Sequence, residues 1–105
     1  MESKPLTVVA VLYINPGMEA EFERFESGAA RIMRRYGGAI TRRIRCAQST
    51  DQLTPYEIHI LEFCDAAAFA GYRNDAELGA MAELRTSAIR QTTVWSGADL
   101  PPYSS

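Results

Sequence analysis

Two strand-like segments of this chain carry apolar side chains on both faces, and this restricts the folds open to it. Residues 6–14 read LTVVAVLYI, a continuous run of apolar and β-branched residues that ends at an Asn-Pro-Gly turn. A second such strand begins at Pro55 and runs to about Phe63, with isoleucines on one face and Leu61 and Phe63 on the other. A strand that is apolar on both faces needs a cover on each side, so we expect both in the centre of a sheet.

Two helical regions separate the strands. Residues 18–36 carry an apolar stripe at three- and four-residue steps, with glutamates in the first part and arginines in the last, as the helix dipole favours. Gly37 supplies the left-handed residue that ends this helix. Asp65 is a good N-cap for the second region, which is interrupted near Asp75. Its later apolar residues are expected to face the core: Leu78, Met81, Leu84 and Ala88.

Residues 39–47 and 91–96 complete a set of four predicted strands. In the first of these, regular alternation places Ile40, Ile44 and Cys46 on the same face as Arg42, with Thr41, Arg43 and Arg45 on the other. Such a one-sided, basic pattern is typical of an edge strand.

The element order β-α-β-β-α-β predicts the ferredoxin-like α+β arrangement, a four-stranded antiparallel sheet with both helices on one face. At 105 residues, the chain fits a single domain, 1–105, with its core at about 6–97 and a tail at 98–105. The helices leave the other sheet face bare. An apolar face of that size exceeds what monomers usually expose, so we predict a symmetric homodimer.

Composition excludes several classes of partner. A net charge of −2 gives no basis for binding nucleic acid, and no apolar run is long enough for a membrane span. The chain starts without a signal-like segment, which favours the cytoplasm, where Cys46 and Cys64 are expected as buried free thiols. One histidine and two cysteines provide no convincing metal site, and phosphate-binding glycine loops are absent, so no cofactor is predicted.

Four short pieces carry a resemblance to a known family: Tyr36-Gly37-Gly38, Glu62-Phe63, Tyr72-Arg73-Asn74-Asp75 and Leu84-Arg85. Through the order and spacing of these four pieces, the chain resembles the dimeric α/β-barrel superfamily over about residues 6–97. It is most similar there to a small uncharacterised family, a domain of unknown function related to antibiotic-biosynthesis-type monooxygenases. The resemblance implies two ferredoxin-like subunits that close their sheets into one barrel, with a ligand cleft between sheet and helices. The superfamily also includes haem-degrading enzymes, muconolactone isomerase-like enzymes and stress-responsive proteins, so no single reaction is implied.

Four residues are candidates for a site in that cleft. His59 shares a face with Leu61 and Phe63 and would be the proton-handling catalytic residue. Tyr13 and Trp95, on neighbouring strands, would be aromatic walls, and Arg73 would anchor a carboxylate. Each has a structural alternative: a core histidine held by a polar neighbour, core packing for the two rings, and an ion pair with Asp75 or a helix-end contact for Arg73.

Glu62 points to the opposite face from His59, so the two cannot form a dyad within one subunit. It would be an acid or base near the dimer interface or barrel mouth; the alternatives are an ion pair at the interface or a place on a water-exposed rim.

Two functions remain open at this point. One is a small cofactor-independent enzyme, monooxygenase-like or isomerase-like, acting on a compact hydrophobic or aromatic metabolite. The other is a non-catalytic dimeric binding or stress-response module. The volume of the space between sheet and helices distinguishes the two functions. A cavity of about 300 Å³ or more with His59 on its wall favours the enzyme, and a filled core favours the binding module.

Overall fold

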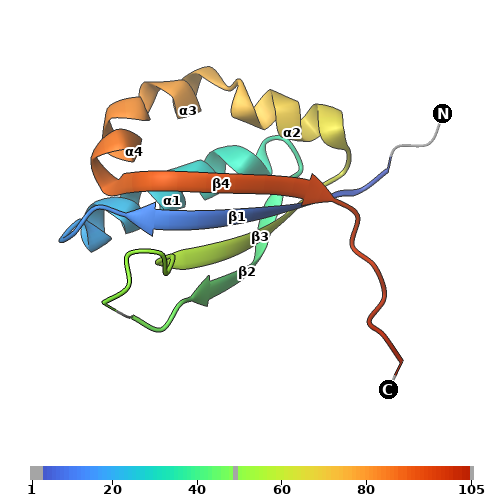
Figure 1. Cartoon of the computed structure of the whole chain (residues 1–105). Coiled ribbons are helices and arrows are strands. Elements are labelled where there is room, and N and C mark those ends of the chain that lie inside the picture. Colours follow the sequence, from blue (N-terminus) through green and yellow to red (C-terminus); the bar gives the residue numbers. More distant parts are fainter. Residues whose placement is uncertain (1–3, 49, 105) are drawn as a thin grey trace.

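The computed structural model of the chain describes residues 4–48 and 50–104. Its elements follow one another as β1 (Leu6–Ile14), α1 (Glu19–Arg34), β2 (Ala39–Arg45), β3 (Glu57–Phe63), α2 (Ala66–Arg73), α3 (Ala76–Ala80), α4 (Ala82–Ala88) and β4 (Ile89–Gly97). This is the predicted ferredoxin-like β-α-β-β-α-β order, except that the second helical region is split into three short helices. The helices lie on one face of the sheet and leave the other bare (Figure 1).

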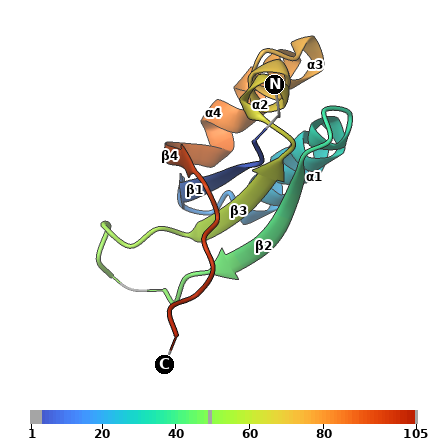
Figure 2. The same cartoon turned by 90° about the vertical axis from the view of Figure 1, so that its right-hand side faces the viewer.

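The four strands form one antiparallel sheet in the order β2-β3-β1-β4. The two strands that are apolar on both faces therefore occupy its centre, as predicted. On the helix-facing side of β1, Val8, Ala10 and Leu12 are buried, and on β3 so are Leu61 and Phe63. Helix α1 lies beside β2 and β3, whereas α2, α3 and α4 extend above β1 and β4 (Figure 2). We call α2, α3 and α4 the roof helices.

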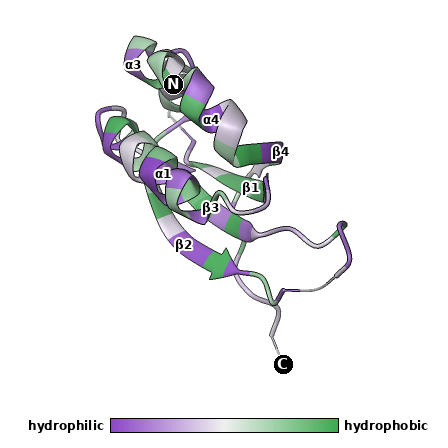
Figure 3. Cartoon of the chain, turned by 90° about the vertical axis from the view of Figure 1, so that its left-hand side faces the viewer, coloured by the Kyte–Doolittle hydropathy of each residue, from purple (hydrophilic) through white to green (hydrophobic). Residues whose placement is uncertain are grey.

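Helix α1 begins one residue after its predicted start at 18 and ends two residues before its predicted end at 36, and the break between α3 and α4 at Met81 was not predicted. Along α1, hydrophilic and apolar residues alternate, and the apolar stripe is buried against the sheet (Figure 3): Phe22, Phe25, Ala29, Ile32 and Met33. Gly37 has a φ of +72°, the left-handed conformation that ends the helix. Asp65 caps α2, since its side chain accepts a 2.8 Å hydrogen bond from the Ala68 amide. Asp75 caps α3 in the same way, at Glu77 and Leu78.

A bulge in β2 corrects the predicted facing of that strand. Ile40 pairs with Leu61, but Arg42 pairs with Ile60, so Thr41 is an extra residue in the ladder. Beyond this residue the alternation is shifted by one. Ile40 therefore faces the helices, opposite to Arg42 and Ile44, whereas regular alternation had placed all three on one face.

The two cysteines are free thiols, but they are not buried as predicted. Cys46 is half-buried and Cys64 is exposed. Cys64 directly follows Phe63, the last residue of β3, so it does not share the buried face of that strand.

The bare sheet face carries apolar side chains from β1, β3 and β4. Val9 and Val11 are half-buried there, and Trp95 is 61% exposed. After β4, the C-terminal tail runs away from the sheet in an extended path (Figure 1), and its side chains Leu100 and Tyr103 are exposed. Within the described part of the chain, no helix combines the length and apolar character needed to cross a bilayer.

Candidate functional site

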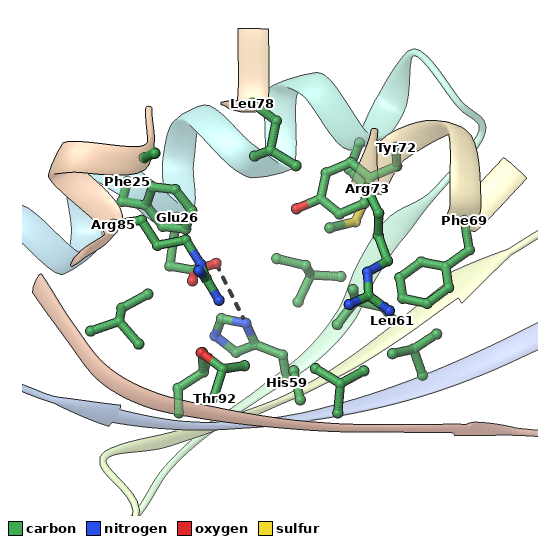
Figure 4. A pocket seen from close by; sticks show the side chains of 18 of the residues that line it. Phe25, Glu26, His59, Leu61, Phe69, Tyr72, Arg73, Leu78, Arg85 and Thr92 are labelled. Carbon is green, nitrogen blue, oxygen red and sulfur yellow. Dashed lines mark ion pairs between the residues drawn. The ribbon is translucent and has the colours of Figure 1, made fainter. Parts of the chain in front are cut away.

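A cavity of about 350 Å³ lies between the sheet and the helices. Its floor is apolar and comes from the inward side chains of the strands: Val8, Ala10, Leu12, Ile40 and Leu61. Its walls come from α1 and from all three roof helices. Polar side chains project into it from several elements (Figure 4): Glu26, His59, Tyr72, Arg73, Arg85 and Thr92. An apolar cavity with a few convergent polar groups is the usual form of a small-molecule site.

His59 is held between two carboxylates at one end of the cavity. It is only 2% exposed, and β3 directs it to the helix-facing side, as the sequence indicated. Its Nε2 is hydrogen-bonded to the carboxylate of Glu57, two residues earlier on the same strand. Its Nδ1 lies 3.7 Å from the carboxylate of Glu26 on α1 (Figure 4). Both ring nitrogens therefore face an acid.

Glu57 is a buried carboxylate held by two arginines of the edge strand. It is 1% exposed and accepts hydrogen bonds from Nε of Arg43 at 3.0 Å and Nε of Arg45 at 2.8 Å. Burial alone would raise its pKa, but the hydrogen bonds from Arg43, His59 and Arg45 outweigh burial and lower the pKa to about 2. Glu57 is thus an anion at neutral pH, and its hydrogen bond orients the imidazole of His59.

Glu26 has the opposite electrostatic character. Its burial in the cavity wall raises its pKa to about 7, the negative charge of Glu57 raises it further, and Arg43 and Arg85 oppose this. The carboxyl group therefore exchanges its proton near neutral pH. Two acids with separated pKa values on either side of one imidazole form an arrangement suited to accepting and returning a proton.

Two arginines reach the cavity from the roof helices. Arg73, at the end of α2, lies with its guanidinium 5.3 Å from the ring centre of Phe69. Arg85, on α4, lowers the pKa of Glu26 through its charge. Within residues 4–48 and 50–104, neither arginine has a carboxylate within ion-pairing distance.

Two hydroxyl groups complete the polar lining. Burial raises the pKa of Tyr72 to about 12, with Glu26 adding to the shift and Arg85 opposing it, so its hydroxyl stays a hydrogen-bond donor at neutral pH. The Oγ1 atom of Thr92 is buried and has no hydrogen-bond partner among the described residues.

The four residues selected from the sequence do not all meet at this cavity. His59 and Arg73 line it, whereas Tyr13 and Trp95 do not. Trp95 pairs with Val9 on the bare face of the sheet, and Tyr13, which pairs with Gln91, directs its hydroxyl to the Leu53 carbonyl at 3.3 Å. The two rings therefore lie across the sheet from His59.

Glu62 is exposed and lies on the opposite face of β3 from His59, as the alternation of side chains along the strand predicted. Arg73 does not pair with Asp75, because Asp75 is bound by Arg35 and by the hydroxyl of Tyr36.

Five further polar residues of the site were not selected from the sequence: Glu26, Glu57, Tyr72, Arg85 and Thr92. For Glu57 a signal was present. Glu57 and His59 are two residues apart, so both side chains lie on one face of their strand. Arg43 and Arg45 are also two residues apart and share one face of the neighbouring strand. Once paired, Arg43 lies opposite His59 and Arg45 opposite Glu57. Glu26 carries no comparable signal, because it borders the apolar stripe of α1 among other glutamates. No cluster of three or more metal-ligating side chains occurs in the described ranges.

Comparisons with known proteins give structural relatives only. No family model and no curated protein sequence matches the chain. A protein of unknown function from Rhodopseudomonas palustris is similar with a TM-score of 0.78 at 14% identity, over 96% of this chain and 86% of that one.

Two further solved structures are similar at comparable levels. A cofactor-independent oxygenase from Streptomyces nogalater, SnoaB, has a TM-score of 0.72 at 16% identity, covering 95% of this chain and 97% of that one. A dabb family protein with a ferredoxin-like fold from Mesorhizobium loti has a TM-score of 0.62 at 17% identity, covering 92% and 98%. At these identities the likeness concerns the fold alone, and it establishes that this chain has a ferredoxin-like fold.

Proposed function

We propose that the chain is a small cofactor-independent enzyme, monooxygenase-like or isomerase-like, whose first step removes a proton from a compact hydrophobic or aromatic metabolite. The observation that carries this proposal is the imidazole of His59, on a cavity wall between Glu57, an anion at neutral pH, and Glu26, an acid that titrates near neutrality. The cavity volume of about 350 Å³ is above the size that separates an open site from a filled core.

Both reaction types share this first step. A C–H or O–H bond of the substrate breaks, its proton goes to the His59–Glu26 pair, and the electron pair stays on the substrate as an enolate or phenolate. Arg85, beside Glu26, stabilises the new negative charge. An isomerase-like enzyme returns the proton to a different atom. In a monooxygenase-like reaction the electron-rich anion reduces dioxygen, so that a CH₂ group becomes a carbonyl and the second oxygen atom leaves as water.

The likeness to a cofactor-independent oxygenase supports the proposal without deciding it, because that likeness concerns the fold. The free thiols Cys46 and Cys64 suit a reducing compartment, and we propose the cytoplasm as the site of action.

We also propose that two copies pair through the bare sheet faces, as the apolar side chains Val9, Val11, Ile60 and Trp95 suggest. Light scattering of the 11.7 kDa chain is expected to give twice that mass. Val9→Lys, in the middle of this face, is expected to give the monomer, and Glu83→Lys on exposed α4 is the matched control. A monomer for the unchanged protein at micromolar concentration would exclude this pairing.

The catalytic proposal is tested by proton exchange, which needs no knowledge of the natural reaction. A panel of compact carbon acids, with 2-tetralone as the first probe, is incubated with the protein in D₂O, and loss of the acidic C–H is followed by NMR. We expect catalysed exchange that falls by about 10²- to 10⁴-fold in His59→Gln. Glu62→Gln, on the other face of the same strand, is expected to exchange at the unchanged rate.

His59→Gln must first show a native circular dichroism spectrum; Glu26→Gln serves as a second variant if it does not. If the cavity binds the probes but exchange is equally fast with and without His59, the catalytic proposal is wrong. The non-catalytic binding module would then be the better description.

A further inference from the structure

The charged groups that line the cavity are predominantly basic, although the whole chain has a net charge of −2. Two arginines, Arg73 and Arg85, face one acid, Glu26, whose pKa of about 7 leaves it partly neutral at physiological pH. Glu57 is neutralised separately by Arg43 and Arg45 behind His59. The cavity therefore presents a local excess of positive charge, which favours an anionic ligand.

Of the two cavity arginines, Arg73 is the one whose charge is not coupled to Glu26. The nearest acid in sequence, Asp75, is occupied: its carboxylate accepts the Tyr36 hydroxyl at 2.5 Å, caps α3 and pairs with Arg35. In the described ranges, 4–48 and 50–104, no carboxylate lies within 4 Å of the Arg73 guanidinium. Its side chain instead extends from α2 into the cavity and lies beside the Phe69 ring (Figure 4).

The second arginine lies at the other end of the cavity. Arg85 projects beside Glu26 and His59, whereas Arg73 lies beside Phe69 and Tyr72, and apolar side chains such as Leu61 separate the two ends (Figure 4). The cavity thus has a proton-handling end, an apolar middle and a cationic end. A ligand that fills it would have a polar reacting group, an apolar body and a negative group, in that order.

We propose that the substrate is a compact hydrophobic acid, with one or two rings, whose carboxylate is bound by Arg73 while its ring body delivers an acidic C–H or O–H to His59 and Glu26. This rests on the proposed function and specifies its substrate class. The planar guanidinium presents two parallel donors, which match a carboxylate better than a lysine ammonium does. The Phe69 ring, 5.3 Å from the guanidinium carbon, lines the same end of the cavity and adds apolar surface for the ligand.

The test is a comparison of an acid with its uncharged isostere, 2-naphthoate against 2-naphthamide, by isothermal titration calorimetry at pH 7.5. For the unchanged protein, we expect the acid to bind at least about 10-fold more tightly than the amide, the size of one charge-assisted contact. Arg73→Gln is expected to remove this preference and Arg73→Lys to retain part of it. The matched control is Arg34→Gln, an arginine at the end of α1 outside the cavity lining, which is expected to leave the preference unchanged.

Three results would overturn the assignment of an acid: equal affinity for acid and amide, an acid preference that survives in Arg73→Gln, or no saturable binding of 2-naphthoate at a few millimolar. Exchange of 2-tetralone, which is uncharged, keeps this test separate from that of the catalytic proposal. If proton exchange depends on His59 but naphthoate binding does not depend on Arg73, the proposed substrate class is wrong and the catalytic proposal stands. If naphthoate binding depends on Arg73 but the protein does not catalyse proton exchange, the anion site stands and the catalytic proposal is wrong.

Discussion

The carboxylate of Glu26 on α1 lies 3.7 Å from Nδ1 of His59 on β3, and both groups are largely shielded from solvent. Nε2 of the same imidazole is bound by Glu57, so the ring is held with Nδ1 directed at Glu26. The pKa of Glu26, about 7, means that this carboxyl group gains and loses its proton in the physiological pH range.

Glu26 is expected to make stability decrease with rising pH. Between about pH 4.5 and 7, the folded protein keeps a proton on Glu26 that the unfolded chain has released, so the free energy of unfolding falls as pH rises through this window. The loss is about 3 kcal/mol for a shift of this size. Urea denaturation at pH 5 and pH 8 measures it. In Glu26→Gln this decrease should disappear, whereas Glu83→Gln on exposed α4 should keep it. An unchanged decrease in Glu26→Gln would show that the group does not titrate there.

Glu57 is expected to act in the opposite direction and at lower pH. Its pKa is lowered to about 2, so its contribution is fully present above about pH 4.5 and is lost as the pH falls toward 2. At pH 7, Glu57→Gln removes the buried anion shared by Arg43, Arg45 and His59, and we expect a loss of about 2–4 kcal/mol. The two arginines keep their exposed pairs with Glu23. Glu62→Gln, on the exposed face of the same strand, should change stability by less than about 0.5 kcal/mol. Equal effects of the two changes in chemical denaturation would contradict this account.

Thr92→Val is expected to stabilise the fold. The Oγ1 atom is buried without a hydrogen-bond partner among the described residues, which costs about 1–3 kcal/mol, and valine has nearly the same shape without the polar atom. Thermal unfolding should show a higher midpoint, equivalent to about 1 kcal/mol. Thr93→Val, the neighbour on the other sheet face, is the control and should change little. A loss of stability in Thr92→Val would mean that the hydroxyl has a bound water as its partner.

Two glycines are expected to respond to alanine with opposite signs. A Cβ on Gly38 would overlap the ring of Phe63, which is buried and cannot move aside, so Gly38→Ala should cost about 1–3 kcal/mol or more. A Cβ on Gly79 meets nothing within 4 Å, and this residue lies within α3 at an ordinary φ. Gly79→Ala should therefore stabilise the protein by about 0.5–1 kcal/mol. The midpoint of urea denaturation distinguishes the two, and a stabilising Gly38→Ala would be inconsistent with this packing.

The fold could be predicted because its main determinants are local and periodic. The apolar run of residues 6–14, the stripe along α1 and the caps at Asp65 and Asp75 each specify an element through nearest neighbours in the chain. The parity of β3 also placed His59 toward the helices, since strand alternation is regular wherever the ladder is unbroken.

The site was only partly predictable because its contacts join distant segments. Trp95 and Tyr13 are aromatic residues on adjacent strands, but their pairing with Val9 and Gln91 puts both on the face away from the cavity. Glu26 gains its altered pKa only when α1 packs over His59, a contact between residues 33 positions apart. The bulge at Thr41 changes the facing of Ile40 and leaves no mark in the hydrophobic pattern.

The roof helices have a consequence for how a ligand reaches the cavity. With 8, 5 and 7 residues, each is too short to be stable alone in water. The middle one has no fully buried side chain: Leu78 is partly buried against the core, and the exposed pairs Arg31 with Glu77 and Arg35 with Asp75 join its start to α1. Its amide protons are therefore expected to exchange with solvent sooner than those of β1, through local unfolding that leaves the sheet intact.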